Sequence, residues 1–340
     1  MSKPLSVAVL GAGYFSRFHI EAWQRHPHTD LVGVADHCAA KTAATGVANT
    51  YNALDAMLTA TQPDILDIAT PPSTHMAAIT AAGRHPVNTV ICQKPFCTST
   101  DEAEAAVAFA SAHNITLVIH ENFRFQPWYR CMKACLDNDR IGQPLQMTFR
   151  LRTGDGQGGD AYLDRQPYFR QMKRFLIAET GVHFIDTFRY LFGPARSVYA
   201  DLSRLNPAIQ GEDSGIVITE HINGVRSVFD GNRLLSHNAA NQRQTLGEAV
   251  LEGTHGTITL NGDGQVNLRR HAQRHEKVLL PAQQWPGFAG DCVYALQSHV
   301  AESVINGTEP ENLANTYLPV LYLVDTIYHS AKHGTRIQVA

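Results

Sequence analysis

The chain has 340 residues, 44% of them hydrophobic, and a formal net charge of −3. This length allows two domains with separate cores. The lack of long basic or acidic runs argues against nucleic acid or an anionic membrane as a partner. No apolar stretch approaches the roughly 20 residues of a membrane span, and the N-terminus lacks the long apolar core of a signal peptide. We therefore expect a cytoplasmic globular protein.

The cysteines and histidines do not suggest a metal site. The six cysteines show no paired spacing of the zinc type, and the seventeen histidines form no motif such as His-Glu-x-x-His. Reduced structural thiols are the simplest interpretation of cysteines in a cytoplasmic chain. We expect no bound metal.

A glycine-rich turn follows the first predicted strand, at 5–10. Gly11, Gly13 and Ser16 stand at the three glycine positions of the dinucleotide fingerprint G-x-G-x-x-G. Gly11 would allow the tight turn, and Gly13 would let the backbone approach a pyrophosphate at the N-terminus of the next helix. Serine replaces the third glycine, at a position that mainly governs helix-to-strand packing and tolerates a small side chain.

An acidic residue follows the second predicted strand, at 31–35. Asp36 lies about twenty residues after the glycines, the spacing at which a carboxylate accepts hydrogen bonds from the adenosine ribose. It would repel a 2′-phosphate, and the next residue is His37 rather than an arginine. NAD is therefore preferred over NADP. Alternatively, Asp36 only caps the helix that follows.

Strands and helices alternate as far as residue 119. Strands are expected at 65–69, 88–93 and 115–119, and helices at 53–60, 76–83 and 101–113. Such alternation predicts a doubly wound parallel sheet. The run at 88–93 stops at Lys94 and Pro95, and proline cannot continue a central strand. Lys94 therefore falls at the carboxyl end of a strand, where open α/β sheets bind ligands.

The alternation ends near residue 122, so we assign 1–122 to an NAD-binding Rossmann domain. Residues 123–340 are expected to form an α/β domain that binds substrate and mediates oligomerisation. Hairpin turn signals such as Asn223-Gly224 separate its β-rich runs, which predicts a large, mostly antiparallel open sheet. Because an apolar outer face of such a sheet needs cover, we expect a homodimer or homotetramer through it.

A polar loop at 152–171 interrupts the second domain. Loops of this length inside a compact domain are usually either functional or disordered, and the aromatic residues of this loop favour an ordered, functional one. Its candidate substrate contacts are Arg152, Tyr162 and Arg165. Arg165 could equally be a surface residue.

Residues 179–192 are expected to form one amphipathic helix that stops at Gly193-Pro194. At about 100° per residue, one narrow face of this helix carries four polar side chains, those of Glu179, His183, Asp186 and Tyr190. Such a stripe favours a face that lines a cavity. It could also be a buried polar network or a solvated face.

Together these motifs resemble the glucose–fructose oxidoreductase, inositol dehydrogenase and MocA family. The matching positions are Gly11-Ala12-Gly13 with His19, 69–72 with His75, Lys94-Pro95, 122–125, and Glu179 to His183 followed by Asp186. Two positions depart from the family pattern: Gln93 replaces the usual glutamate, and Glu179 stands where aspartate is commoner. Within the family, 14–16, 92–96, 120–129 and 154–158 look like the bacterial D-apiose dehydrogenases.

The resemblance implies a Rossmann domain followed by an α/β domain with a large open sheet, and NAD as the cofactor. The expected cofactor contacts are Gly11, Gly13, Tyr14, Phe15, Asp36, Thr70, Pro72, His75, Gln93, Lys94 and Asn122. The expected substrate contacts are Lys94, Asn122, Glu179 and His183, in addition to the three loop residues.

Oxidation of a sugar carbinol requires a hydride acceptor, a base for the hydroxyl proton, and groups that fix the carbon near the nicotinamide. NAD supplies the first of these. We hypothesise that His183 accepts the proton and that Lys94 polarises the hydroxyl or relays its proton; the reverse assignment remains open. Glu179 could orient the imidazole or bind a sugar hydroxyl.

We therefore expect an NAD-dependent dehydrogenase that oxidises the anomeric carbon of an aldose, in the first place D-apiose, to the lactone. The alternatives are another aldose, an inositol or an anhydrosugar as substrate, or reduction as the working direction. A further alternative is an NAD-sensing protein without turnover. Lys94 and His183 argue against a sensor, since a sensor needs no proton acceptor at the nicotinamide.

Overall fold

The computed structural model describes residues 3–339, and the chain divides into two compact units. One unit consists of the chain up to Asn122 together with Val293–Pro319. The other consists of Phe123–Cys292 and the chain from Val320 onward. Helix α9 (Ala314–His333) crosses this division, with Pro319 inside it.

The expected second domain, 123–340, is wrong for the segment 293–319. This segment belongs to the first unit because its polar side chains complete hydrogen bonds there. Gln297, on helix α8 (Cys292–Asn306), donates to the Asp67 carboxylate at 3.0 Å. Asn312 donates to the carbonyl of Glu121 at 2.7 Å.

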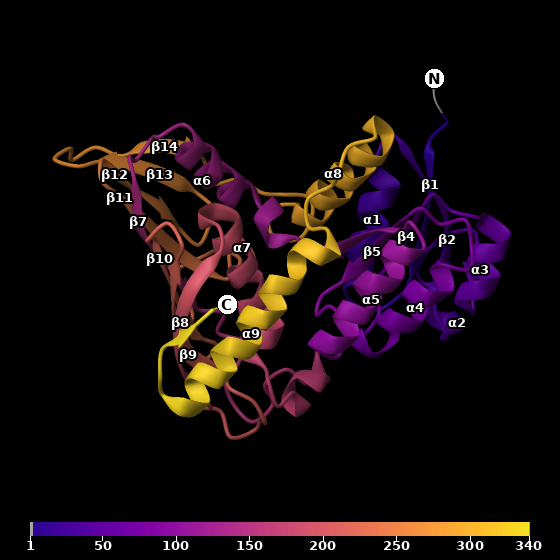
Figure 1. The fold of residues 1–340 in the computed structure, drawn as a ribbon, viewed down its shortest axis with the longest axis horizontal. Coiled ribbons are helices and arrows are strands. Elements are labelled where there is room, and N and C mark those ends of the chain that lie inside the picture. The colour runs from indigo at the N-terminus through magenta and orange to yellow at the C-terminus, as the bar shows by residue number, and fades with distance from the viewer. Residues whose placement is uncertain (1–2, 340) are drawn as a thin grey trace. The chain divides into compact units, whose positions relative to one another are not determined.

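The first unit contains the predicted parallel sheet, in the order β3-β2-β1-β4-β5-β6. Its strands are β1 (Leu5–Leu10), β2 (Thr29–Ala35), β3 (Thr50–Tyr51), β4 (Ile65–Ile68), β5 (Thr89–Gln93) and β6 (Thr116–His120). Its connecting helices, visible around the sheet in Figure 1, are α1 (Ser16–Arg25), α2 (Ala39–Ala43), α3 (Leu54–Thr61), α4 (His75–Ala82) and α5 (Thr100–Ala112). The strand order reverses between β1 and β4, the point at which such sheets bind ligands.

Burial explains why these strands were recognisable in the sequence. Strands β4 and β5 are buried along their whole length, and parallel strands covered on both faces are continuous apolar runs. Helix α5 begins as expected, because Ser99 accepts the backbone N–H of Glu102 at 3.2 Å.

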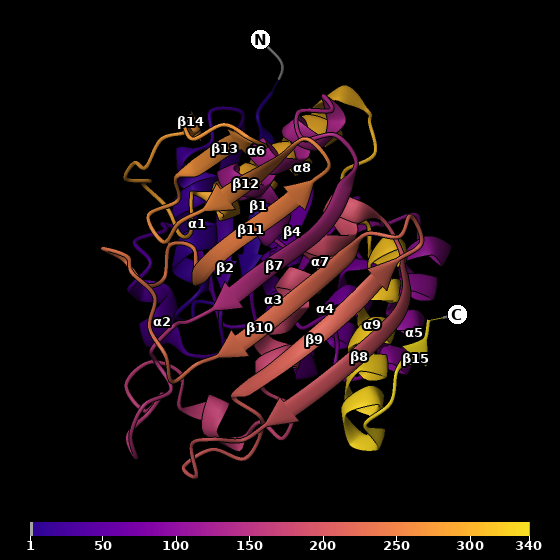
Figure 2. The same ribbon diagram turned by 90° about the vertical axis from the view of Figure 1, so that its left-hand side faces the viewer.

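The second unit is built on a nine-stranded sheet in the order β14-β13-β12-β11-β7-β10-β9-β8-β15 (Figure 2). Its strands are β7 (Pro144–Leu151), β8 (Ala195–Ser203), β9 (Ser214–His221), β10 (Arg226–Asn232), β11 (Gly247–Gly253), β12 (Gly256–Leu260), β13 (Val266–Arg270), β14 (Lys277–Leu280) and β15 (Ile337–Gln338). Only the β7–β10 pair is parallel among the described strand pairs of this sheet. The prediction of a mostly antiparallel sheet is therefore confirmed. Strands β13, β14 and β15 were not foreseen, because they are short and two of them contain Arg or Lys.

Helices α6 (Pro127–Asp137) and α7 (Val182–Phe192) belong to the second unit. The inner face of the sheet packs on α7 through aromatic rings: Phe184 stacks on Phe149 at 4.0 Å and lies 5.4 Å from Phe229. The 152–171 loop ends in the short 3₁₀ helix Pro167–Gln171.

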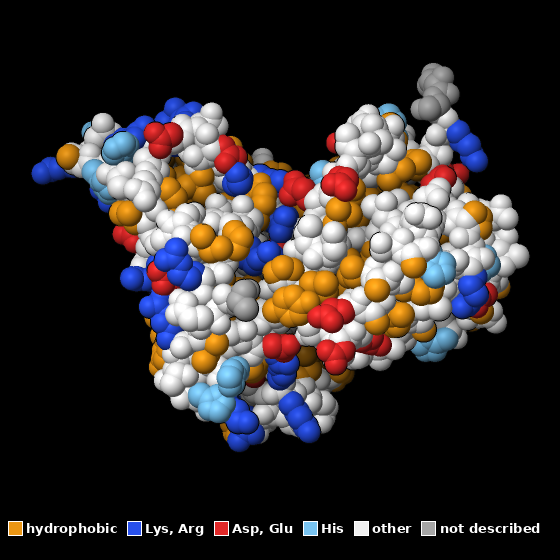
Figure 3. Space-filling model, viewed as in Figure 1, with side chains coloured by type: hydrophobic (Ala, Val, Ile, Leu, Met, Phe, Trp, Pro, Cys, Tyr) orange, Lys and Arg blue, Asp and Glu red, His pale blue; other side chains and the backbone are white. Residues whose placement is uncertain are grey.

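The described surface carries charges of both signs, interspersed with apolar side chains on the face seen in Figure 3. Within residues 3–339, none of the helices combines the length and the hydropathy that a membrane crossing requires.

Candidate active site

The predicted cofactor residues of the first unit meet at one edge of its sheet. Strands β1, β4, β5 and β6 are paired in register at their carboxyl ends. Gly11, Thr70, Lys94 and Asn122 follow these four strands, and Asp36 follows β2. This is the edge at which doubly wound sheets bind dinucleotides.

The glycine loop is closely packed at Gly11 and open at Gly13. Gly11 has φ +108°, and a Cβ atom there would lie 2.6 Å from the carbonyl oxygen of Ala69, so no side chain fits. A Cβ at Gly13 would meet nothing within 4 Å, which leaves its backbone open to a ligand. Ser16 is fully buried; its hydroxyl accepts the Gly13 N–H and donates to Ala69, both at 3.1 Å. The serine thus ties the loop to the end of β4.

The carboxylate of Asp36 accepts two backbone hydrogen bonds, while helix α2 has Cys38 as its N-cap and no side-chain cap. One carboxylate oxygen accepts the backbone N–H of Ala12 in the glycine loop at 2.9 Å, and the other accepts that of Cys38 at the same distance. Burial alone would raise the pKa of Asp36, but these two hydrogen bonds outweigh it and lower the pKa. Asp36 is therefore held as a carboxylate beside the loop.

His75 supports the turn after β4 from inside. It is fully buried, and its Nε2 bonds to the carbonyl oxygen of Thr70 at 2.8 Å. Burial lowers the pKa of His75, so the ring is neutral and Nε2 donates to that carbonyl. Thr70 also bonds to Thr74 at 2.7 Å, while Pro72 is half-buried. The buried His75 thus anchors the backbone of Thr70.

Tyr14 and Phe15 pack on helix α1. The guanidinium of Arg17 lies 4.4 Å from the centre of the Tyr14 ring and donates to its hydroxyl at 3.2 Å. Phe15 contacts the rings of Phe18 at 5.3 Å and His19 at 5.6 Å. The two aromatic residues therefore stiffen the start of the helix whose N-terminus faces the glycine loop.

Gln93 does not offer its side chain to a ligand as expected. It is 8% exposed, its Oε1 accepts the backbone N–H of Lys94 at 2.7 Å, and its Nε2 lies 3.0 Å from Nε2 of His19. We therefore reassign Gln93 from a cofactor contact to a residue that holds Lys94. Asn122 is 2% exposed, next to Glu121, whose carboxylate accepts the Tyr317 hydroxyl at 3.1 Å.

The expected single helix at 179–192 is wrong at its start. Leu176–Gly181 forms a π-helical turn, and regular α-helix begins at Val182. A π turn holds more residues than an α turn, so Glu179 is out of register with the later members of the polar stripe. Such turns occur frequently at functional sites.

Two of the four stripe residues, Asp186 and Tyr190, are hydrogen-bonded within the second unit. Asp186 is fully buried and accepts two hydrogen bonds from Arg124, at 2.8 and 2.5 Å. The hydroxyl of Tyr190 accepts from Arg130 at 2.9 Å. His183 is 5% exposed, and its ring is stacked on Phe123 at 3.9 Å with a 5° angle between the planes. The alternative of a satisfied polar network thus holds for Asp186 and Tyr190.

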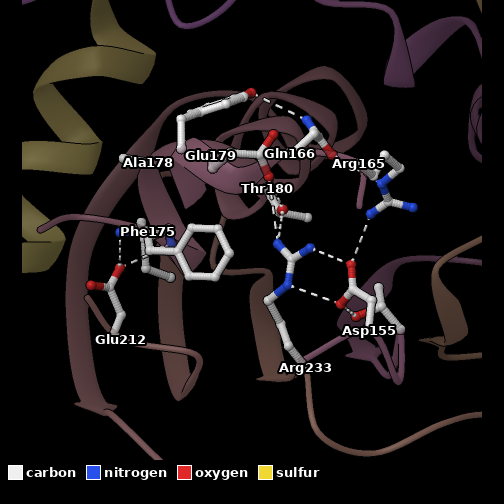
Figure 4. A network of polar contacts seen from close by, with 12 residues as sticks. Asp155, Arg165, Gln166, Phe175, Ala178, Glu179, Thr180, Glu212 and Arg233 are labelled. Carbon is white, nitrogen blue, oxygen red and sulfur yellow. Dashed lines mark hydrogen bonds and ion pairs between the residues drawn. The ribbon is translucent and has the colours of Figure 1, made fainter. Parts of the chain in front are cut away.

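Sequence reasoning missed a buried arginine of the second unit with several ionic partners, Arg233, which directly follows β10. Its guanidinium is buried and donates to both oxygens of Asp155, at 3.2 and 2.7 Å (Figure 4). The same group donates to the Thr180 hydroxyl at 2.8 Å and lies 3.5 Å from the Glu179 carboxylate. Burial alone would raise the pKa of Asp155, but Arg233 and Arg165 outweigh it and lower the pKa.

The three loop candidates have different environments. Arg152 is 8% exposed and is bonded to the backbone oxygen and carboxylate of Asp230, at 2.7 and 2.6 Å. Tyr162 is 7% exposed and packs with Phe169 and other apolar residues. Arg165 remains partly exposed, with its guanidinium 3.1 Å from Asp155. Arg165 is thus the most exposed of the three, and the substrate contacts of all three residues stay predictions.

Family comparisons agree with this arrangement. Residues 5–121 match the model of the oxidoreductase family with an NAD-binding Rossmann fold, and 129–259 match the GFO/IDH/MocA C-terminal domain. The chain belongs to the Gfo/Idh/MocA oxidoreductase family. It is therefore an NAD-dependent dehydrogenase, and the glycine loop with Asp36 fits that cofactor.

Two curated relatives are D-apiose dehydrogenases. The enzyme of Paraburkholderia graminis is 31% identical, over 99% of this chain and 90% of its own. That of Rhizobium rhizogenes is 28% identical, over 98% and 97%. Among solved structures, an oxidoreductase from Agrobacterium radiobacter in complex with NAD⁺, L-tartaric acid and magnesium is similar, with a TM-score of 0.89, 26% identity, and 99% and 98% coverage.

The family assignment supplies the hydride acceptor, since NAD takes a hydride at its nicotinamide when bound. The chain's own residues must supply the proton chemistry. Among residues 3–339, no group of three or more His, Cys, Asp or Glu side chains is arranged to hold a metal ion. Lys94 and His183 are the candidates for the proton.

Proposed function

We propose that this dehydrogenase oxidises the anomeric carbon of an aldose, in the first place D-apiose, to the lactone. The observation that carries the proposal is the similarity, over nearly the whole chain, to two D-apiose dehydrogenases. In this reaction the C1–H hydride reduces NAD⁺ to NADH, the hydroxyl proton goes to a base, and C1 becomes a carbonyl. Six free cysteines and the use of NAD favour the cytoplasm as its compartment.

In the proposed mechanism His183 accepts the hydroxyl proton and Lys94 polarises the hydroxyl or relays its proton. Stacking on Phe123 supports this role for His183, because it fixes the plane of the imidazole. In the reverse assignment, Lys94 accepts the hydroxyl proton and His183 polarises the hydroxyl or relays its proton. Asn122 is proposed to contact the nicotinamide and the substrate.

Arg165 and Glu179 are proposed to bind sugar hydroxyls. Arg165 is tied to Asp155, and Glu179 lies against Arg233, so one buried network orders both side chains. Donors and acceptors that are already fixed lose little entropy when the sugar binds, which favours discrimination between sugars.

The first experiment is NADH formation at saturating NAD with a panel of D-apiose, common pentoses and hexoses, and myo-inositol. We expect a strong signal with D-apiose. Turnover confined to another polyol would retain the mechanism and replace the substrate. NAD binding without turnover on any member would favour the sensing protein over the D-apiose enzyme.

We also propose that two copies of the chain associate through the outer face of the nine-stranded sheet. One row across this face carries Tyr199, Ile218, Val228, Thr148 and Val250, paired strand to strand. Tyr199 is 37% and Val250 40% exposed. A twofold-related copy would place row against row. Light scattering should give a dimer or tetramer at micromolar concentration, and Val250→Lys should dissociate it.

A further inference from the structure

A line of buried hydrogen bonds connects Asp67, inside the first unit, with the backbone of Lys94. The Asp67 carboxylate lies 2.9 Å from Nδ1 of His19. Nε2 of His19 lies 3.0 Å from Nε2 of Gln93, whose Oε1 accepts the Lys94 N–H at 2.7 Å. Asp67 and His19 are fully buried, and Gln93 is 8% exposed.

Only one arrangement of protons satisfies all three contacts. The Lys94 N–H can only donate, so the atom of Gln93 that faces it is the oxygen. The NH₂ group of Gln93 must then face His19, and the Nε2 atom of His19 must accept. The imidazole therefore carries its proton on Nδ1 and donates it to Asp67. His19 is neutral in this arrangement.

The surroundings keep Asp67 ionised. Its carboxylate also accepts from the indole of Trp23 at 2.8 Å and the amide of Gln297 at 3.0 Å. Burial alone would raise the pKa of Asp67, whereas the three donors, from His19, Trp23 and Gln297, favour its charged form. The titratable groups that face His19 are Asp67 from β4 and His120 from β6, whose ring lies 4.1 Å away.

We propose that Asp67, His19 and Gln93 are positioning residues that hold Lys94 for proton chemistry, and that residue 93 sets the charge of His19. A glutamine at position 93 requires a neutral imidazole. A glutamate there would accept from both His19 and Lys94, and His19 would then be an imidazolium between two carboxylates. This inference rests on the proposed function only in giving Lys94 a role toward the substrate.

Gln93→Glu is therefore the informative substitution. The new negative charge is offset by the proton that His19 takes up, so the buried group keeps its net charge and the Lys94 N–H keeps its acceptor. Of the two new charges the carboxylate is the nearer to Lys94, whose N–H it accepts, so it favours the ammonium form of the Lys94 side chain although the imidazolium of His19 offsets part of its field. The limb of the pH–kcat profile that Lys94 governs should move to higher pH by about one unit.

The direct test is ¹⁵N NMR of the histidine rings in the full-length protein, with the His19 signals identified by their loss in His19→Gln. In the wild type, His19 should show one protonated and one bare ring nitrogen, with the proton on Nδ1, at pH 7. In Gln93→Glu both nitrogens should be protonated. A wild-type His19 that is an imidazolium, or that carries its proton on Nε2, would overturn the proposal.

Kinetics supply a second test that does not need His19→Gln to fold. Gln93→Leu removes the acceptor for Lys94, and kcat should fall by about tenfold with the KM for NAD unchanged. Gln93→Glu should restore kcat at the pH of its shifted optimum. Equal losses in both variants without a pH shift would show a merely structural role.

Gln126→Glu is the matched control, because Gln126 is 1% exposed and bonded to Trp128 rather than to a histidine. In Gln126→Glu no histidine should gain a proton, and the pH–kcat profile should match that of the wild type. The NMR result requires no turnover. An absence of sugar oxidation would therefore overturn the proposed function alone, whereas a wrong tautomer would overturn this inference alone.

Discussion

The carboxyl edge of the six-stranded sheet and the Arg233 network are ordered by different forces. At the sheet edge, strand register brings Gly11, Lys94 and Asn122 to the same end of the sheet, and neutral hydrogen bonds such as that from Lys94 to Gln93 add to it. In the second unit, Asp155, Glu179 and Arg233 come from three separate segments and are joined by charge. A substitution at the sheet edge should therefore change kcat or cofactor affinity more than the free energy of unfolding. A substitution in the Arg233 network should change the free energy of unfolding more.

The first prediction separates chemistry from stability at the sheet edge. In Lys94→Ala we expect kcat to fall by about a thousandfold, within the range for loss of a proton-transfer group. The backbone of residue 94 still donates to Gln93, so the dissociation constant of NAD should change by less than about threefold. Steady-state NADH formation and fluorescence titration with NAD measure the two quantities.

Lys133→Ala is the matched control for Lys94→Ala, since Lys133 lies on α6 in a surface pair with Asp137. It should leave kcat unchanged. Near-normal turnover of Lys94→Ala, together with normal NAD binding, would remove Lys94 from the proton chemistry.

The same contrast decides what could be predicted from the sequence. Gly11, Asp36 and Lys94 each follow a short apolar run, so strand ends identify them without knowledge of partners. Arg233 gave no such signal, because its partner Asp155 lies 78 positions away in the chain. Glu179 was placed on an α-helix because a π turn leaves no mark in a pattern read at 100° per residue. Segment 293–319 was misassigned because its Gln297 and Asn312 find their partners only in the folded first unit.

The second prediction concerns the stability of the network. Asp155→Ala leaves the buried guanidinium of Arg233 without its bidentate partner, and we expect a loss of about 3 kcal/mol in the free energy of unfolding. Urea unfolding followed by circular dichroism measures it. Asp325→Ala is the control: it breaks the pair with Arg174, in which both side chains are nearly half exposed and screened by solvent, and should cost less than about 1 kcal/mol. Equal losses in the two variants would refute the special role of the network.

The third prediction returns to the sheet edge with a smaller effect. Asp36→Ala removes the proposed acceptor for the ribose hydroxyls and the negative charge that opposes a 2′-phosphate. We expect the affinity for NAD to fall by about tenfold. The affinity for NADP should fall less, so the preference for NAD over NADP should shrink. Calorimetric titration with each cofactor measures both affinities. Asp30→Ala is the control. Asp30 is exposed at the start of β2, the strand that Asp36 follows, and its substitution should leave the affinities for NAD and NADP unchanged. An unchanged NAD/NADP ratio in Asp36→Ala would remove Asp36 from cofactor selection and leave it only its backbone contacts with Ala12 and Cys38.

The fourth prediction, the smallest, concerns the response of the network to acid. The pKa of Asp155 is lowered in the folded chain, so its carboxylate stabilises the fold fully above its unfolded value, about 3.9. That contribution is lost as the pH falls through the lower, folded value. The difference in unfolding free energy between wild type and Asp155→Asn should therefore be constant from pH 7 to about pH 5 and should shrink below about pH 4. Urea titrations of both proteins at each pH give this difference directly. A difference that grows on acidification would mean that the folded chain favours the protonated acid, and that burial rather than Arg233 governs Asp155.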